Sequence, residues 1–449
     1  MLQSTGAIQP EDFDYACACG RRHSVEIECI KIGSGILTEL SAVLEPYKNG
    51  ELFVVGDENT YRAMGSAVAA ILQDGRIKQY IFSEKHLIPD EKALGKLLIE
   101  MPAKASLIIA VGSGTINDLC RYLSYKTKIP YIILCTAPSM DGYASVVSPL
   151  IVRGVKTTYN AVYPKAILAD IDIMRNAPMQ MLQAGLGDIL GKYTALADWQ
   201  LARLLQGEYY CEGIERQVRE AVHKCVSTSG IVLQRSEAAV ERITEALILS
   251  GLAIGMVDSS RPASGEEHHL SHCWEMLFMK KGEGERWLHG NLVGVGTVIA
   301  AEAYEYLNRL NIREIAAAGK YKSLSRESWE AGLEQVYGEN AKDIIAFKQE
   351  AINFDPEART ARMQGIVEHW ETLKLICLQH LPAAEELMQV LKNAGAVCTP
   401  GALGLTKELF QRSVVAAKDI RKRYGIFQLL EDIGELDNAA AHIANKYYD

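Results

Sequence analysis

The 449-residue sequence contains no run of 18 apolar residues and no apolar segment behind basic residues at its start. The first absence argues against a membrane-spanning helix, and the second argues against a secretory signal peptide. Basic residues are also in the minority, 47 against 56 acidic ones, which gives a net charge of -9. We therefore expect no membrane insertion and no general nucleic-acid binding, although a small basic pocket for a phosphorylated substrate remains compatible with this charge.

The sequence also lacks cysteine pairs at regular spacing. Its ten cysteines are scattered and lie mostly within apolar segments. A chain this long can bury a large core without a disulfide framework, so we expect reduced thiols and a cytoplasmic protein. Cys17 and Cys19, with His23 nearby, resemble half of a zinc knuckle, but no second pair follows at ligand spacing. A turn with packed thiols is the favoured interpretation.

Apolar runs alternate with amphipathic segments in the first part of the chain. Strands are expected at 24–30, 52–57, 79–82, 106–111 and 131–135. Helices are expected at 33–44, 60–74 and 90–101. Strands that alternate with helices form a parallel sheet that is covered on both faces. We therefore predict a Rossmann-like α/β domain over residues 1–180.

Long amphipathic segments dominate the remainder of the chain. They are rich in Ala, Leu, Glu and Lys, and the clearest are 192–206, 213–234, 237–256 and 406–424. Strand patterns almost vanish here, so we predict an all-helical domain over residues 181–449. The more polar segment 320–360 is expected to be an irregular surface excursion.

Small and hydroxyl-bearing residues follow three predicted strands, where α/β sheets bind ligands. The segment 112–118, Gly-Ser-Gly-Thr-Ile-Asn-Asp, lacks the GxGxxG fingerprint but could present backbone N–H groups to a pyrophosphate at a helix start. Asp57 could accept hydrogen bonds from a ribose or could cap the next helix, and its spacing does not decide between these. The loop 136–145 offers hydroxyl groups for a dinucleotide and one carboxylate, Asp141, for a polar substrate, with ordinary turn chemistry as the alternative.

Four of the ten histidines fall between positions 268 and 289. His268 and His272 share one helix face and His289 follows one loop later, a pattern typical of a zinc-type metal site. Asp188, at a helix start, is the best-placed carboxylate to complete it, although it could also be a helix cap. One Asp and two His leave metal positions open, as catalysis requires. A non-catalytic nucleotide-binding protein with a structural metal is therefore the less favoured alternative.

In this order the motifs resemble the superfamily of iron-type alcohol dehydrogenases, glycerol dehydrogenases and dehydroquinate synthases. The segments 136–145 and 260–268 are most similar to its bacterial sn-glycerol-1-phosphate dehydrogenase group, as are Ala177-Pro178 before 185–188 and Cys17-x-Cys19-Gly20. The resemblance spans roughly residues 15–300, with an echo at 420–424. It implies a dehydroquinate synthase-like fold with the site in the cleft between two domains, and it implies a homodimer.

The resemblance implies interconversion of dihydroxyacetone phosphate and sn-glycerol 1-phosphate by hydride transfer, feeding glycerophospholipid-type metabolism. Asp188, His268 and His289 would bind one divalent metal ion, nickel or zinc. Asp141, His272 and metal-bound Asp188 would contact the substrate, with Asp188 and His272 serving catalysis. The residues implied to contact NAD or NADP are Asp57, Gly114, Thr115, Ile116, Asn117, Asp118, Thr136, Ala137, Pro138, Ser139 and Ser145. A glycerol or other polyol dehydrogenase of the same superfamily is the alternative.

Two features of the sequence depart from the family pattern, and several individual residues refine the expected function. Cys120-Arg121 stands where relatives commonly have a small residue and Lys, and His269 adds an imidazole off the 268/272 face. Asp57 favours NADH, because a carboxylate repels a 2′-phosphate. The candidates for binding the substrate phosphate are Arg153, Lys156 and Lys192. A lyase of the dehydroquinate synthase kind is disfavoured, because the loop after Asp141 reads Gly-Tyr-Ala-Ser.

Overall fold

The computed structural model describes residues 8–72, 76–153, 155–284, 286–319, 321, 325–348 and 354–448. It divides into two compact units. The first comprises Met1–Gly185 and Arg216–Ser260, and the second comprises Leu186–Glu215 and Arg261–Asp449. The sequence placed the boundary at 180/181, whereas here the first segment runs to Gly185 and residues 216–260 also belong to the first unit. The main element of residues 216–260, α8 (Glu237–Val257), packs against β3 (Cys29–Gly33) and α5 (Ile171–Met174) of that unit.

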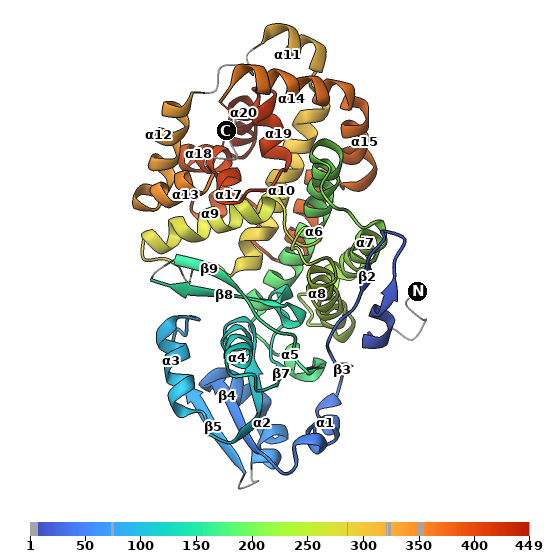
Figure 1. Cartoon of the computed structure of the whole chain (residues 1–449), viewed down its shortest axis with the longest axis vertical. Helices are drawn as coiled ribbons and strands as arrows, with labels where there is room; N and C mark the ends of the chain where they lie inside the picture. The colour runs from blue at the N-terminus through green and yellow to red at the C-terminus, as the bar shows by residue number, and fades with distance from the viewer. Residues whose placement is uncertain are drawn as a thin grey trace. The chain divides into compact units, whose positions relative to one another are not determined.

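The first unit is built on a six-stranded parallel sheet in the order β3-β10-β7-β6-β4-β5 (Figure 1). The strands are β3 (Cys29–Gly33), β4 (Glu51–Asp57), β5 (Ile77–Phe82), β6 (Ala105–Gly112), β7 (Tyr131–Cys135) and β10 (Ala166–Asp170). Both faces of β7 and β10 are buried, as in parallel sheets generally. The predicted α/β class is therefore confirmed, although the strand expected at 24–30 begins later and β10 was not foreseen.

Helices cover the sheet on its two faces. On one face, Leu52 and Val54 of β4 pack with Leu37, Leu40 and Met64 in one buried cluster. That cluster places α1 (Leu40–Leu44) and α2 (Glu58–Leu72) on the same face. The crossovers α3 (Glu91–Glu100) and α4 (Gly114–Thr127) run in the opposite direction along the sheet order, so right-handed connections place them on the other face.

Further short elements complete the first unit. They are the antiparallel pair β1 (Tyr15–Ala16) and β2 (Arg22–His23), the antiparallel pair β8 (Val147–Val152) and β9 (Val155–Asn160), and the helices α5 (Ile171–Met174) and α7 (Glu212–Ser227), the last of which continues from the second unit. Neither hairpin was predicted as such. The strands of the first are only two residues long, and Pro149 interrupts the pattern of the second.

The second unit contains helices and no strand within its described residues, which agrees with the all-helical prediction. It begins within α6 (Met179–Gln206) and continues with α9 (Glu266–Lys280) and α10 (His289–Asn308). The later helices are α11 (Ile312–Ala318), α12 (Arg326–Tyr337), α13 (Ala341–Lys348), α14 (Pro356–Glu368), α15 (Trp370–His380), α16 (Ala384–Asn393), α17 (Pro400–Leu403), α18 (Lys407–Ala417), α19 (Ile426–Asp432) and α20 (Leu436–Tyr448). Among all described residues, no helix has both the length and the apolar character needed to cross a membrane.

The prediction of an irregular excursion at 320–360 is wrong for the described part of that segment. Residues 320, 322–324 and 349–353 lie outside the described residues, but α12, α13 and the start of α14 occupy most of the rest. Trp329, Leu333 and Val336 of α12 are buried in the main core of the unit. Their spacing is helical, but the polar residues between them hide it from a simple reading of composition.

Arg121 is fully buried in α4 and fixes the loop that follows β7. Its guanidinium donates to the Tyr131 hydroxyl at 3.0 Å, to Asp118 Oδ1 at 2.9 Å and to the Val147 carbonyl at 3.0 Å. It also donates to the carbonyls of Gly142 and Tyr143. One side chain thus satisfies a carboxylate and three backbone acceptors in the interior of the unit.

We expect Arg121→Met to lower the free energy of unfolding by about 3–5 kcal/mol, because Asp118 and these carbonyls lose a buried charged donor. Urea unfolding of the full-length protein, followed by circular dichroism, measures the change. Lys78→Met is the matched control, since it removes an ion pair to Glu100 at 3.3 Å in which both side chains are nearly half exposed. Such pairs contribute about 0–1 kcal/mol, so equal losses in the two variants would contradict the role given to Arg121.

Candidate active site

The carboxyl ends of β4, β6 and β7 meet at one edge of the sheet in the first unit. Gly56 of β4 lies opposite Val111 of β6, and Gly112 of β6 lies opposite Cys135 of β7. The register therefore brings Asp57, the start of α4 and the loop 136–139 to the same edge. These are the segments that the sequence predicts to bind a dinucleotide.

The start of α4 can offer its backbone to an anion. The first N–H groups of a helix, here those of Gly114, Thr115 and Ile116, have no acceptor within the helix and carry its partial positive charge. Gly112 is required beneath this turn, because a Cβ there would lie 2.6 Å from the Cβ of Ile116. The absence of a side chain at Gly112 therefore permits the tight strand-to-helix connection.

The side chains of this helix start serve the fold. Ile116 and Asn117 are buried, and Asn117 Nδ2 donates to the Gly142 carbonyl at 3.0 Å. Asp118 pairs with Arg121 at 2.9 Å. The side chains of Ile116, Asn117 and Asp118 are thus engaged within the fold. In the predicted segment 114–118, the backbone of the first helical turn is the better candidate for contact with a cofactor.

Asp57 caps α2. Its Oδ1 accepts hydrogen bonds from the backbone N–H groups of Asn59 at 2.9 Å and Thr60 at 3.0 Å. The structure thus contains the helix cap that the sequence offered as one of two roles. A contact with the cofactor ribose stays a prediction.

The loop after β7 is largely buried and internally bonded. Thr136, Ala137, Ser139 and Ser145 are all buried, as is Pro138. The Tyr143 hydroxyl donates to the Ala137 carbonyl at 2.7 Å, and Ser145 Oγ accepts from the Val147 N–H at 3.1 Å. These bonds hold the loop in one shape at the carboxyl edge of the sheet.

Asp141, the predicted substrate ligand of this loop, is partly exposed. Its Oδ2 accepts a hydrogen bond from Ser250 Oγ of α8 at 2.9 Å, so α8 orients the carboxylate. Sequence reasoning missed Ser250, because nothing in its helical surroundings marks it as functional.

The second unit brings together the three predicted metal ligands. Asp188 comes from α6, His268 from α9, and His289 is the first residue of α10. One ligand atom of each lies within 4.8 Å of those of the others. His268 Nε2 stands 3.6 Å from Asp188 Oδ1, and the rings of His268 and His289 have centroids 5.2 Å apart. The donor atoms of all three residues thus converge on one point.

A carboxylate stands behind each of the two imidazoles. His268 Nδ1 is 2.7 Å from Glu267 Oε1, and His289 Nδ1 is 2.6 Å from Glu275 Oε1. Each pairing places the ring proton on Nδ1 and leaves the lone pair of Nε2 for a metal ion. Neither glutamate was predicted as part of the site, although Glu275 lies three positions after His272 on the same helix face.

Glycines let the three ligand-bearing helices approach one another. A Cβ on Gly187 of α6 would lie 2.2 Å from the carbonyl oxygen of Gly290 in α10. A Cβ on Gly296 of α10 would lie 2.5 Å from the carbonyl oxygen of Glu267 in α9. Larger residues would separate the helices and, with them, Asp188, His268 and His289.

Lys192 neutralises Asp188 from one helical turn away. Its ammonium donates to Asp188 Oδ1 at 2.7 Å and to the Ala263 carbonyl at 3.0 Å, and both charged side chains are fully buried. The structure therefore assigns Lys192 to the aspartate, rather than to a substrate phosphate as the sequence suggested.

His272 lies beside the predicted metal ligands and reaches the surface. Its Nδ1 is 3.1 Å from Glu275 Oε2, and its ring stacks on that of His289 with centroids 5.2 Å apart. Glu275 thus orients both imidazoles through its two oxygens. His272, Glu275 and His289 also have ligand atoms within 4.8 Å of one another, so His289 lies at the junction of two clusters.

His269 is buried on another side of α9. Its Nδ1 is 2.7 Å from Glu266 Oε2. Burial, assisted by Arg423, holds the pKa of His269 well below its usual value, and burial raises the pKa of Glu266 to about 8. The pair is therefore held by a hydrogen bond between neutral groups, away from the ligand atoms of His268.

Cationic side chains of the segment 420–424 lie in the same unit as these histidines. Arg423 Nη1 is 3.4 Å from the Ser264 carbonyl, just before α9. Arg421 is exposed, whereas burial lowers the pKa of the partly buried Arg423 to about 10, so both guanidinium groups stay charged. Among the earlier phosphate candidates, Arg153 is exposed at the β8–β9 turn, and the side chain of Lys156 lies outside the described residues.

Comparison with known proteins identifies the relatives of this chain. Residues 31–178 match the family model of iron-containing alcohol dehydrogenases. Glycerol-1-phosphate dehydrogenase (NAD(P)+) of Geobacillus stearothermophilus is 32% identical, and the alignment covers 94% of this chain and 96% of the relative. The protein of the same name from Bacillus velezensis is 39% identical over 68% of this chain and 78% of its own length.

The fold has solved counterparts. Glycerol dehydrogenase from Schizosaccharomyces pombe superposes with a TM-score of 0.61 at 16% identity, covering 94% of this chain and 90% of that one. An identity this low supports the fold alone, whereas the full-length similarity to the Geobacillus protein defines the family. The chain belongs to the glycerol-1-phosphate dehydrogenases, within the iron-containing alcohol dehydrogenase family.

Proposed function

We propose that this protein is an NAD(P)- and metal-dependent oxidoreductase that interconverts dihydroxyacetone phosphate and sn-glycerol 1-phosphate. The observation that carries the proposal is the convergence of Asp188, His268 and His289, with a carboxylate behind each imidazole. Three protein ligands leave coordination positions for a substrate. The names of the relatives, which cover nearly the whole chain, support the phosphorylated substrate.

The donor set suits a divalent transition metal. One carboxylate and two neutral imidazoles are ligands that zinc, nickel and iron share, and we propose nickel or zinc. When bound, such an ion acts as a Lewis acid that polarises the ketone and favours hydride transfer to its carbon. Lys192 holds the Asp188 carboxylate in place, while Glu267 and Glu275 fix the ring orientations.

The remaining chemistry falls to residues of this chain. The N–H groups at the start of α4 would bind the cofactor pyrophosphate, and Asp141, oriented by Ser250, would hold a substrate hydroxyl. His272, with Nδ1 turned to Glu275, can carry a proton at Nε2 for the alcohol oxygen. Arg421 and Arg423 would supply the positive charge for the phosphate, because guanidinium groups pair well with phosphate oxygens.

We also propose that the protein acts in the cytoplasm. None of the ten cysteines forms a disulfide, which fits a reducing compartment such as the cytoplasm. A homodimer stays a prediction from the family resemblance.

A substrate comparison tests the proposed activity. Purified protein, loaded in turn with nickel and zinc, is assayed with NADH or NADPH against dihydroxyacetone phosphate and dihydroxyacetone. We expect a clear preference for the phosphorylated ketone in kcat/KM. Arg421→Leu and Arg423→Leu should lower kcat/KM for that ketone by about 10–100-fold, because each removes a charged hydrogen bond, and should spare dihydroxyacetone.

Arg153→Leu is the control, since it removes an exposed arginine at the turn between β8 and β9. Reduction of dihydroxyacetone alone would show instead the polyol dehydrogenase named as the alternative.

Removal of a metal ligand provides a second prediction. His289→Ala should abolish turnover and the retention of a metal ion by Asp188 and His268, because two ligands bind far more weakly than three, while unfolding stays cooperative. Metal content by mass spectrometry and NAD(P)H oxidation measure the two effects. His442→Ala, at an exposed histidine of α20 in the same unit, should change neither. Full metal occupancy and a normal rate in the His289 variant would refute the ligand assignment.

The carboxylate behind His289 gives a third prediction. Glu275→Gln should weaken metal affinity by about 10–100-fold, because an amide is a poorer acceptor for the ring N–H and supports both His289 and His272 less well. A competition titration against a chelator measures the affinity, and excess metal should restore much of the activity. Glu283→Gln, which removes an exposed partner of Arg286, is the matched control. Equal affinities in the two variants would remove Glu275 from the site.

A further inference from the structure

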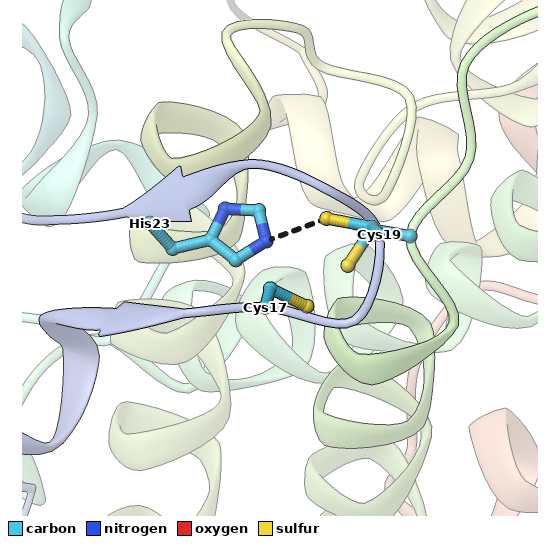
Figure 2. A group of neighbouring side chains, drawn as sticks. Cys17, Cys19 and His23 are labelled. Atoms are coloured by element: carbon cyan, nitrogen blue, oxygen red, sulfur yellow. Dashed lines mark hydrogen bonds between the residues drawn. The ribbon is translucent and has the colours of Figure 1, made fainter.

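The first unit begins with a small hairpin that the proposed function does not use (Figure 2). Its strands β1 and β2 pair in antiparallel register, with Tyr15 opposite His23. The turn is tight, since Cys17 N–H donates to the Arg21 carbonyl at 2.9 Å and Gly20 N–H to the Cys17 carbonyl at 3.0 Å. Gly20 has φ +86°, a left-handed conformation that favours glycine.

Cys17, Cys19 and His23 gather at this turn, as Figure 2 shows. Their ligand atoms all lie within 4.8 Å of one another, and Cys19 Sγ is 3.4 Å from His23 Nε2. A tetrahedral zinc ion with bonds of about 2.0–2.3 Å holds its ligand atoms about 3.5–3.8 Å apart. The three side chains are therefore close to the arrangement that a zinc ion needs.

The orientation of His23 is what the sequence pattern did not reveal. Its Nδ1 is 2.8 Å from the backbone carbonyl of Met256 in α8, and the side chain is fully buried. A carbonyl only accepts, so Nδ1 carries the proton and Nε2 presents its lone pair toward Cys19. This is the backing hydrogen bond that metal-binding imidazoles usually have.

The hairpin also has reason to need a cross-link. Two residues in each strand give a ladder too short to be stable by itself. Both thiols are partly exposed, so an ion can reach them from solvent.

We propose that Cys17, Cys19 and His23 bind a structural zinc ion that is separate from the catalytic metal. The two thiols release their protons to solvent and bind as thiolates, His23 binds through the neutral Nε2, and a fourth ligand completes the shell. The ion ties the turn to β2 and, through His23, to α8. It takes no part in hydride transfer.

Cobalt substitution of the full-length, reduced protein tests this proposal. Thiolate ligands give Co²⁺ an intense near-ultraviolet charge-transfer absorption that carboxylate and imidazole ligands cannot give. We expect the band in the wild type and in His289→Ala, and its loss in the Cys17→Ser/Cys19→Ser double variant. Cys29→Ser, a partly exposed cysteine of the same unit, should keep it. Metal content should fall from about two ions per chain to about one in each of the His289 and double variants.

The double variant should also unfold at lower urea concentration, while its turnover below that transition matches the wild type. Absence of the charge-transfer band in the wild type, or its persistence in the double variant, would overturn the zinc site. Because the band does not depend on His289, these outcomes are distinct from failure of the proposed enzymatic activity.

Discussion

Close approach of three helices is the constraint on which the candidate metal site depends. Asp188, His268 and His289 each come from a different helix, and their donor atoms can converge only because Gly187 and Gly296 carry no side chain at the contacts. Packing of backbone against backbone leaves little freedom for the helices to shift. The ligand positions are therefore fixed by the core of the second unit, before any metal binds.

That close packing creates an electrostatic problem, because α9 carries a run of ionisable residues into the interior. Glu266, Glu267 and His269 are all buried, and removal from water penalises every charged form. The structure resolves this by pairing, with Glu267 against His268 and Glu266 against His269. The two pairs have different consequences. The pair of Glu267 and His268 leaves Nε2 of His268 facing the carboxylate of Asp188. The pair of Glu266 and His269 is buried between the helices and does not contribute to the metal site.

The sequence predicted those parts of the structure that follow from local spacing. His268 and His272 share a helix face by their separation alone, and β4, β6 and β7 were recognisable as apolar runs with polar ends. Partners distant in sequence could not be predicted in the same way. Glu275 acts on His289 across a loop, and Ser250 acts on Asp141 from a helix more than a hundred residues later. Lys192 is a different case, because it lies only one helical turn from Asp188 and spacing alone could have indicated the pair, although it was named as a phosphate candidate instead. The 320–360 segment failed for a related reason, since Trp329 shows its role only when the core that buries it is known.

Two donor sets of different chemistry can explain how one chain would bind two metal ions without exchanging them. The thiolates of Cys17 and Cys19 are soft ligands that favour zinc and disfavour hard cations, whereas Asp188 with two imidazoles accepts several divalent metals. Accessibility adds to this difference, because the thiols are partly exposed while Asp188 and its partner Lys192 are both fully buried. A metal ion that binds Asp188 must compete with the Lys192 ammonium for that carboxylate. This competition disfavours cations that bind weakly. Selectivity at that site would then rest on the strength of the imidazole bonds, and these depend on the carboxylates of Glu267 and Glu275.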